Sequence, residues 1–145
     1  MACVERRRTT DHKTTGQRTT VRDYTKIEAW RLADDLTVAI YEQTRSFPKE
    51  EMYGLTSQLR RASYSVPANI VEGSSRESKK DYLHFLYIAR GSLSETQYFI
   101  HLARRLGYLS SEEADKLHGK VVATVTSLSV IGLMRWSSGQ LSVVS

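Results

Sequence analysis

Apolar side chains recur at steps of three and four residues along most of this chain, and that spacing limits its fold more than any other feature. The apolar runs cover residues 27–40, 52–70, 82–100 and 117–131. Such steps place side chains on one face of an α-helix, whereas a half-buried strand alternates at every second residue. No segment alternates in that way. The pattern therefore predicts four amphipathic helices and an all-α fold.

Prolines and glycines indicate where these helices end. The first helix is expected to stop near Ser46, because Pro48 disfavours helical geometry at the residue before it. Pro48 itself suits the first turn of the second helix, where its missing N–H costs nothing. Gly73 is expected to close the second helix and Gly107 the third, since glycine commonly follows a helix C-terminus.

Serines mark where the third and fourth helices begin. Ser78 with Asp81 resembles a capping box, and Ser110 with Glu113 forms a proper one. The connections between the apolar runs are short, so consecutive helices are expected to lie antiparallel. We therefore predict an up-and-down antiparallel four-helix bundle over residues 24–137.

The two ends of the chain are expected to lie outside this bundle. Residues 1–23 are rich in Thr, Arg and Lys and nearly free of large apolar side chains. They cannot bury enough surface to offset the entropy of ordering, so we predict a disordered basic tail. A frayed C-terminus is predicted for residues 138–145.

Length and composition fit one domain in the cytoplasm. The chain has 145 residues, and its single cysteine, Cys3, excludes an internal disulfide framework. The chain has no run of about 18 apolar residues, which is the length that a membrane-spanning helix needs. The N-terminal residues lack the apolar core of a secretory signal. The net charge is +5, with an excess of three positive charges in residues 1–23 and again in residues 73–108. Such segments are compatible with nucleic-acid binding, and equally with an ordinary solvated surface.

Several specific runs in the middle of the chain resemble a known family. They read QLRRAS at residues 58–63, VPANIVEG at 66–73, IARGSLSE at 88–95 and LARRLGYL at 102–109. Over about residues 24–135 the chain is similar to the four-helix-bundle family known from intervening sequences of bacterial 23S rRNA genes. The resemblance does not extend to the N-terminal tail or to the segment after Trp136.

This resemblance implies a non-enzymatic bundle that assembles with itself, typically as a pentameric ring. Distant relatives of the family are the accessory variability proteins of diversity-generating retroelements, which bind a reverse transcriptase and nucleic acid. The expected partners are therefore further copies of the chain, RNA or DNA, and a reverse transcriptase.

Two adjacent arginines, Arg60 and Arg61, are the first candidates for a functional site. If the first two predicted helices are aligned antiparallel, counting residues outward from the turn between them, these arginines lie beside Asp35 and Asp34. One interpretation is a structural ion-pair network, within the bundle or across a subunit interface. The other is a phosphate site shared with Arg90, which the second turn places level with Arg61. Arginine suits either role, because its planar fork binds carboxylate and phosphate alike; we favour the network.

Pro67 and the residues after it are assigned structural roles. Pro67 removes a backbone donor and is expected to kink the second helix, so that the carbonyl of Ser63 needs a serine hydroxyl or a water as partner. Asn69 is expected to act as a cap, and Glu72 to pair with Arg76 one turn later. A catalytic carboxylate and amide would be the alternative, but no nucleophile or second acid accompanies them.

Cations near both ends of the third predicted helix are the candidates for binding nucleic acid. They are Lys79, Lys80, Arg104 and Arg105, and the other interpretation is a solvated helix face. The tyrosines on or near this helix could stack on bases. We favour core or interface positions for them; they are Tyr82, Tyr87, Tyr98 and Tyr108.

Sequence signatures of enzymes and metal sites are absent. The four histidines show no metal-ligand spacing, and no HExxH, CxxC, phosphate-binding loop or Gly-x-Ser-x-Gly turn occurs. We therefore predict no catalytic residue, no metal and no cofactor. The predicted function is a homo-oligomeric scaffold that binds nucleic acid, or a nucleic-acid-associated protein, through basic surfaces. The alternative is a bundle that binds only proteins.

Overall fold

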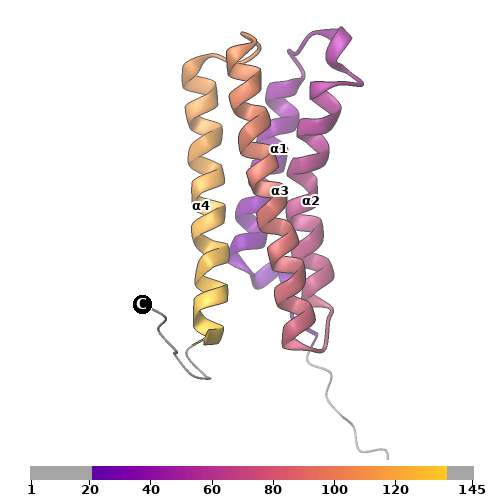
Figure 1. The fold of residues 1–145 in the computed structure, drawn as a ribbon, viewed down its shortest axis with the longest axis vertical. Helices are drawn as coiled ribbons and strands as arrows, with labels where there is room; N and C mark the ends of the chain where they lie inside the picture. The colour runs from indigo at the N-terminus through magenta and orange to yellow at the C-terminus, as the bar shows by residue number, and fades with distance from the viewer. Residues whose placement is uncertain (1–20, 137–145) are drawn as a thin grey trace, which may run out of the picture.

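The computed structural model describes residues 21–136, and every regular element in that range is helical. The four long helices are α1 at Glu28–Thr44, α2 at Leu55–Ser74, α3 at Lys79–Arg105 and α4 at Ser111–Trp136. Short 3-10 turns, η1 at Tyr24–Lys26 and η2 at Lys49–Glu51, precede α1 and α2. Figure 1 shows the four helices side by side along the long axis, with the chain reversing direction at each connection. The predicted all-α, up-and-down bundle is confirmed.

The helices surround one core, and each packs against two neighbours. α1 contacts α2 and α4, and α3 contacts the same two helices, so α1 and α3 lie diagonally opposite. The largest fully buried apolar side chains come from all four helices and are Leu36, Ile40, Leu59, Val66, Ile70, Leu93, Ile100 and Val121. Packing is most extensive between α2 and α3 and least extensive between α3 and α4.

Serine side chains cap α3 and α4 as the sequence predicts. At the start of α3, Ser78 Oγ accepts the N–H of Asp81 at 3.0 Å. Before α4, the N–H of Glu113 donates to Ser110 Oγ at 3.1 Å, and the N–H of Ser110 donates to the Glu113 carboxylate at 2.8 Å. These bonds satisfy amide donors that have no partner inside the helix.

The two glycines predicted to end helices have different roles. Gly107 lies just past α3 with φ +78°, and its N–H donates to the carbonyl of Arg104 at 3.0 Å, as expected for a left-handed glycine cap. Gly73 instead lies buried inside α2. A Cβ at Gly73 would come within 2.8 Å of Phe85 Cβ and 3.1 Å of the Tyr82 ring on α3. The helix does end one residue after Gly73, at Ser74, but Gly73 is not the left-handed cap that the sequence predicts. Its role is to allow the close approach of α3.

The second helix begins later than the position of Pro48 predicts. Pro48 has extended geometry, with φ −53° and ψ 142°, and precedes η2, whereas α2 starts at Leu55. Gly54 departs from helical geometry between the two, with φ −108° and ψ −118°. The carboxylate of Glu51 accepts the N–H of Leu55 at 2.8 Å and so caps α2 from the preceding turn. The connection from α1 to α2 therefore occupies residues 45–54.

The first described residues are held against the connection between α2 and α3. The guanidinium of Arg22 donates to the carbonyl of Arg76 at 2.9 Å and lies 4.4 Å from the ring centre of Tyr82. Ordered structure therefore starts before the boundary predicted after residue 23. The rest of the predicted tail, residues 1–20, and the predicted frayed segment, residues 138–145, lie outside the described residues.

Candidate functional site

Arg60 reaches from α2 to α1, where its partners are neutral. Its Nε donates to Thr44 Oγ1 at 2.8 Å, and its guanidinium lies 4.6 Å from the ring centre of Tyr41. The hydroxyl of Thr44 donates in turn to the carbonyl of Ile40 at 2.8 Å. A hydroxyl and an aromatic face thus hold this half-buried cation without neutralising its charge.

Arg61 points to the other neighbour of α2. Its guanidinium meets the carboxylate of Glu95 on α3 at 3.4 Å, and each side chain is 52% exposed. Solvent screens an exposed pair of this kind, so its contribution to stability is small. The two adjacent arginines therefore serve different helix contacts rather than one shared site.

The predicted network of these arginines with Asp34 and Asp35 is wrong within a single chain. Asp35 pairs with Arg31 of its own helix at 3.4 Å, and Asp34 has no side-chain partner within residues 21–136. The cause is the register between α1 and α2. Thr44 lies beside Arg60 because the connection is long, whereas Asp35 lies nine residues earlier, about 13 Å along the helix.

The three arginines of the alternative phosphate site are also not brought together. The register between α2 and α3 places Arg61 beside Glu95, and Ser65 Oγ lies 3.0 Å from Ser92 Oγ. Arg90 is five residues from Glu95 and lines a pocket against α4 instead. The prediction that Arg61 lies beside Arg90 is wrong, because it placed the turn between the second and third helices too early in the chain.

Pro67 lies in α2, which continues past it to Ser74. Because proline has no N–H, the carbonyl of Ser63 lacks its usual helical donor. The hydroxyl of Thr37 on α1 lies 3.0 Å from this carbonyl and 2.9 Å from the carbonyl of Ala33, so its single proton is shared between the two acceptors. The Ser63 hydroxyl bonds instead to the carbonyl of Arg60 at 2.8 Å. The missing backbone bond is thus replaced by a contact between helices, which sequence reasoning did not identify.

The residues at the end of α2 have local structural roles. Glu72 pairs with Arg76 one turn later, as predicted, and the Arg76 guanidinium lies 4.8 Å from the ring centre of Phe85. Asn69 is not a cap, because its side-chain amide donates to the carbonyl of Ser65 inside the helix at 2.7 Å. Asn69 and Glu72 are thus each engaged by a residue one turn away in the sequence, Ser65 within α2 and Arg76 just after its end.

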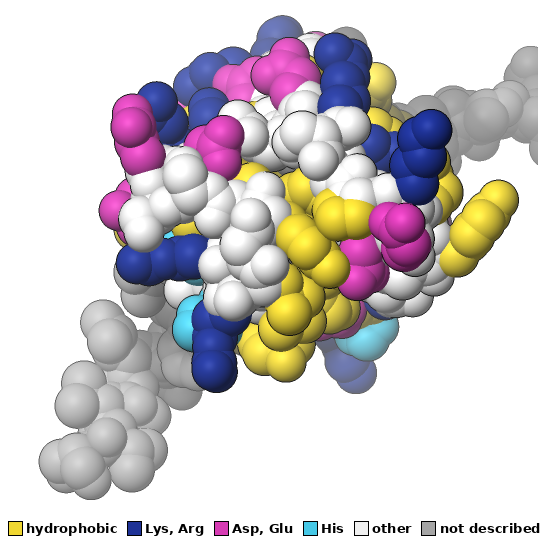
Figure 2. Space-filling view, turned by 90° about the horizontal axis from the view of Figure 1, so that it is seen from above, with side chains coloured by type: hydrophobic (Ala, Val, Ile, Leu, Met, Phe, Trp, Pro, Cys, Tyr) yellow, Lys and Arg dark blue, Asp and Glu magenta, His cyan; other side chains and the backbone are white. Residues whose placement is uncertain are grey.

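The predicted nucleic-acid candidates Lys79, Lys80, Arg104 and Arg105 are exposed on α3. None of these four side chains forms a hydrogen bond or ion pair in the part of the chain that the structure describes. The two pairs lie at opposite ends of the helix, roughly 37 Å apart at 1.5 Å per residue. Figure 2 shows that the end bearing the α3–α4 connection carries Lys and Arg interspersed with Asp and Glu around a hydrophobic centre.

The tyrosines divide between the core and the surface. Tyr82 is buried, at 3% exposure, and Tyr108 is half-buried, so both fit the favoured prediction. Tyr87 and Tyr98 are 62% and 57% exposed on α3. Val38 and Tyr41 on α1 are exposed as well. The bundle therefore has apolar and aromatic side chains on its surface that its own core does not use.

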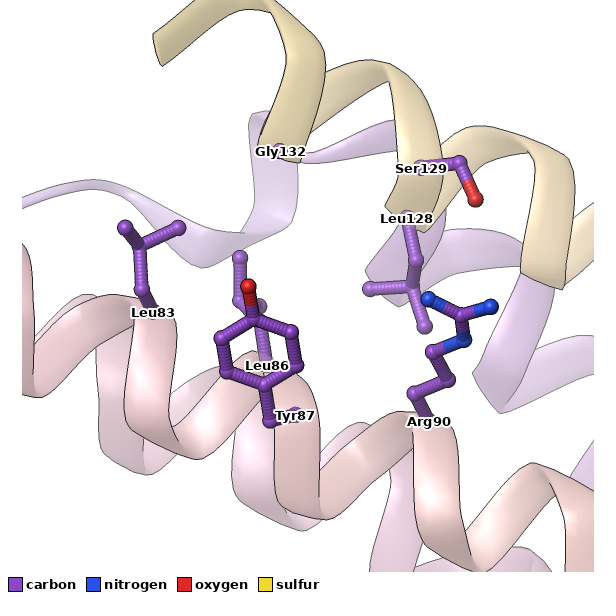
Figure 3. A pocket seen from close by; sticks show the side chains of 7 residues that line it. All are labelled: Leu83, Leu86, Tyr87, Arg90, Leu128, Ser129 and Gly132. Atoms are coloured by element: carbon purple, nitrogen blue, oxygen red, sulfur yellow. The ribbon is translucent and has the colours of Figure 1, made fainter. Parts of the chain in front are cut away.

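A pocket of about 420 Å³ opens between α3 and α4, where packing is sparsest. Its lining residues are Leu83, Leu86, Tyr87 and Arg90 of α3 with Leu128, Ser129 and Gly132 of α4. Figure 3 shows Tyr87 and Arg90 extending from α3 across the opening toward α4. Sequence reasoning missed this pocket. The sequence signal that could have indicated it is the pair of small residues Ser129 and Gly132, which lie on the face of α4 that packs toward α3.

A second, more open pocket lies further along the same two helices. Its lining residues are Ser94, Gln97, Tyr98 and His101 of α3 with His118 of α4. No group of three or more His, Cys, Asp or Glu side chains within residues 21–136 could hold a metal ion. No helix in that range is long and apolar enough to cross a membrane.

The fold is that of a small antiparallel four-helix bundle with exposed cations along one helix. The chain belongs to the family of 23S rRNA-intervening sequence proteins, whose sequence pattern matches residues 25–129. A solved structure with a similar fold is a protein of unknown function from the S23 ribosomal protein family of Bacteroides thetaiotaomicron, with 22% sequence identity and a TM-score of 0.65. The match covers 71% of this chain and 97% of that one. The comparison with curated proteins finds no match.

Proposed function

We propose that this protein is a non-enzymatic scaffold of the cytoplasm that assembles with itself and binds nucleic acid, or a nucleic-acid-associated protein such as a reverse transcriptase. The observation that carries the proposal is the set of four exposed cations toward the two ends of α3, which have no hydrogen-bond or ion-pair partner within residues 21–136. Their charges are free to replace the counterions of phosphate groups, which is the main source of affinity in binding that does not depend on base sequence.

Self-assembly strengthens this proposal, because these four cations form just two small groups in a single bundle. The pentamer that we propose from the family resemblance would repeat both groups five times around its ring. The exposed side chains of Val38 and Tyr41 on α1 supply apolar surface for contacts between copies. Light scattering coupled to size exclusion tests this step. A mass near five times 16.5 kDa is expected, and a mass near 16.5 kDa at micromolar concentration would exclude assembly.

Binding is tested by fluorescence anisotropy with labelled single-stranded RNA and double-stranded DNA over a range of salt concentrations. The wild-type protein is expected to lose affinity steeply with salt. In the variant Lys79→Gln/Lys80→Gln, the slope of log affinity against log salt should fall by about 0.7 to 0.9 per lost phosphate contact. The same holds for Arg104→Gln/Arg105→Gln.

The matched control removes two cations that already have acidic partners. Lys26 lies 3.8 Å from Asp23, and Lys116 lies 3.1 Å from Glu112. The variant Lys26→Gln/Lys116→Gln therefore has the same formal charge change as each test variant, but should alter the salt slope less. Equal effects in all three variants would mean that total charge, and not the α3 surface, determines binding.

The alternative function is a bundle that binds proteins only. Two observations favour it: the exposed apolar side chains on α1 and α3, and the mixture of acidic and basic side chains at the end shown in Figure 2. In that case no anisotropy change is expected with either nucleic acid at moderate salt. A purified reverse transcriptase that co-elutes with the bundle at that salt would then support the protein partner.

A further inference from the structure

The pocket between α3 and α4 has aliphatic walls. Leu83 and Leu86 line it from α3, and Leu128 lines it from α4. A Cβ built on Gly132 would meet no other atom within 4 Å, so the space beside this glycine is open. The volume of about 420 Å³ falls within the range of small-molecule sites, which is roughly 300–1,000 Å³.

Arg90 is the charged residue of this pocket. Its guanidinium forms no hydrogen bond or ion pair with any residue in the range 21–136, and the described residues that line the pocket include no Asp or Glu. Ser129 lies on the opposite wall and donates its hydroxyl to the carbonyl of Val125 at 2.9 Å. An unpaired positive charge thus borders an aliphatic cavity, and this combination is complementary to a molecule with one anionic end and one apolar end.

We propose that this pocket binds an aliphatic carboxylate, with its hydrocarbon chain between the leucines and its carboxylate on Arg90. The guanidinium fork matches a carboxylate in two parallel hydrogen bonds. The leucine walls favour an alkyl chain over a nucleobase, because they offer no partners to the polar edge of a base. This site is separate from the cations proposed to bind nucleic acid, which lie toward the two ends of α3.

The proposal is tested by isothermal titration of the full-length protein with hexanoate, octanoate and decanoate. The affinity should rise about fourfold per added methylene until the chain outgrows the pocket. Decanol has the same chain without the charge and should bind roughly two- to fivefold more weakly than decanoate, because Arg90 is exposed and solvent screens its ion pair with a carboxylate. A cation of the same chain length, decyltrimethylammonium, should bind no better than decanol.

Two substitutions separate the charge from the cavity. Arg90→Gln should reduce decanoate affinity to that of decanol and leave decanol binding unchanged. Gly132→Leu should fill the cavity and abolish binding of both compounds. Because leucine is a better helix former than glycine, this variant should fold at least as well as the wild type.

Gly119→Leu is the matched control, since Gly119 is also a helical glycine of α4 with open space around it and does not line the pocket. It should bind decanoate with wild-type affinity. Wild-type decanoate binding that survives in Gly132→Leu, or is unchanged in Arg90→Gln, would overturn the proposal. So would an absence of binding at millimolar decanoate in the wild type.

Two other occupants of the pocket would give different results, and either would overturn the proposal. If a second copy of the chain covers the groove, Gly132→Leu will change the oligomer mass while Gly119→Leu will not. If residues 137–145 fill the pocket, decanoate will bind only after that segment is deleted. RNA binding by Arg90→Gln is measured in parallel, so that failure of the nucleic-acid proposal can be recognised independently.

Discussion

Tyr108 donates its hydroxyl to Glu51 Oε1 at 3.1 Å, and this contact joins the two connections at one end of the bundle. The other oxygen of Glu51 accepts the N–H of Leu55, the first residue of α2. The ring of Tyr108 also packs on Phe47, with 5.5 Å between ring centres. One carboxylate therefore positions both the start of α2 and the connection between α3 and α4.

Substitution of Glu51 is expected to cost more than loss of the Tyr108 hydroxyl. Glu51→Ala removes the cap of α2 as well as the tyrosine contact and should lower the free energy of unfolding by about 1 kcal/mol or slightly more. Tyr108→Phe removes one hydrogen bond only and should have a smaller effect. Urea unfolding measures both. Once Glu51 is alanine, the further change Tyr108→Phe should add almost nothing, and full additivity would contradict a shared contact.

The pKa of Tyr108 predicts a difference at alkaline pH. Burial raises this pKa above its usual value, and the hydrogen bond to Glu51 and the nearby acidic charges raise it further. The folded state therefore favours the neutral hydroxyl. The resulting stabilisation is fully present below the unfolded pKa of about 10 and is lost as pH rises through the higher folded pKa. The difference in unfolding free energy between wild type and Tyr108→Phe should change over that range, and parallel pH profiles would contradict this prediction.

The architecture could be predicted because it depends on side-chain spacing alone. Leu36, Ile40, Leu59 and Ile70 are all fully buried at the positions that the three-and-four pattern gives them. Serine caps are equally local, since Ser110 and Glu113 are three residues apart. Signals of this kind require no knowledge of which helices are neighbours or how they are aligned.

The contacts between helices could not be predicted in the same way, because they depend on the register. Gly54 and the turn η2 delay the start of α2, and this moves Arg60 away from Asp35 and next to Thr44. The pocket on α3 and α4 likewise depends on where α4 begins relative to α3. A shift of a few residues in a connection leaves each amphipathic pattern intact but changes every pair across the helices.

Arg60 and Arg61 should differ in their effects on stability although they are adjacent. Arg60→Ala removes a 2.8 Å bond to Thr44 and the packing on Tyr41, and should cost about 1–2 kcal/mol. Arg61→Ala removes only an exposed ion pair with Glu95 and should cost less than about 0.5 kcal/mol. Chemical unfolding of the two variants tests this. Equal losses would show that the two arginines act as one network after all.

Alanine at Gly73 and at Gly91 should change stability in opposite directions. At Gly73 the new methyl group would lie 2.8 Å from Phe85 Cβ, and overpacking of this kind costs about 1–3 kcal/mol. At Gly91 in α3 a Cβ meets nothing within 4 Å, so the variant should gain about 0.5–1 kcal/mol from helix propensity. Thermal melting followed by circular dichroism measures both. A melting temperature of Gly73→Ala at or above that of the wild type would contradict the close approach of α3.

The contact between Thr37 and the carbonyl of Ser63 predicts a coupling between Thr37 and Pro67. In the wild type, Thr37→Val leaves this carbonyl without a donor, because Pro67 has no N–H. An unsatisfied buried carbonyl should cost about 1–3 kcal/mol. In the Pro67→Ala background the new amide can donate to Ser63, so the same threonine substitution should cost much less.

A double-mutant cycle measures this coupling directly. The four proteins are the wild type, Thr37→Val, Pro67→Ala and the double variant, each unfolded in urea. Thr37 also lies 2.9 Å from the carbonyl of Ala33 in its own helix, and its single hydroxyl proton serves both acceptors. The cycle therefore measures how much more the Ser63 carbonyl depends on that proton when residue 67 is proline. We expect a coupling of about 1 kcal/mol or more. A coupling near zero would mean that the Ser63 carbonyl finds another partner, such as water, when Thr37 is replaced.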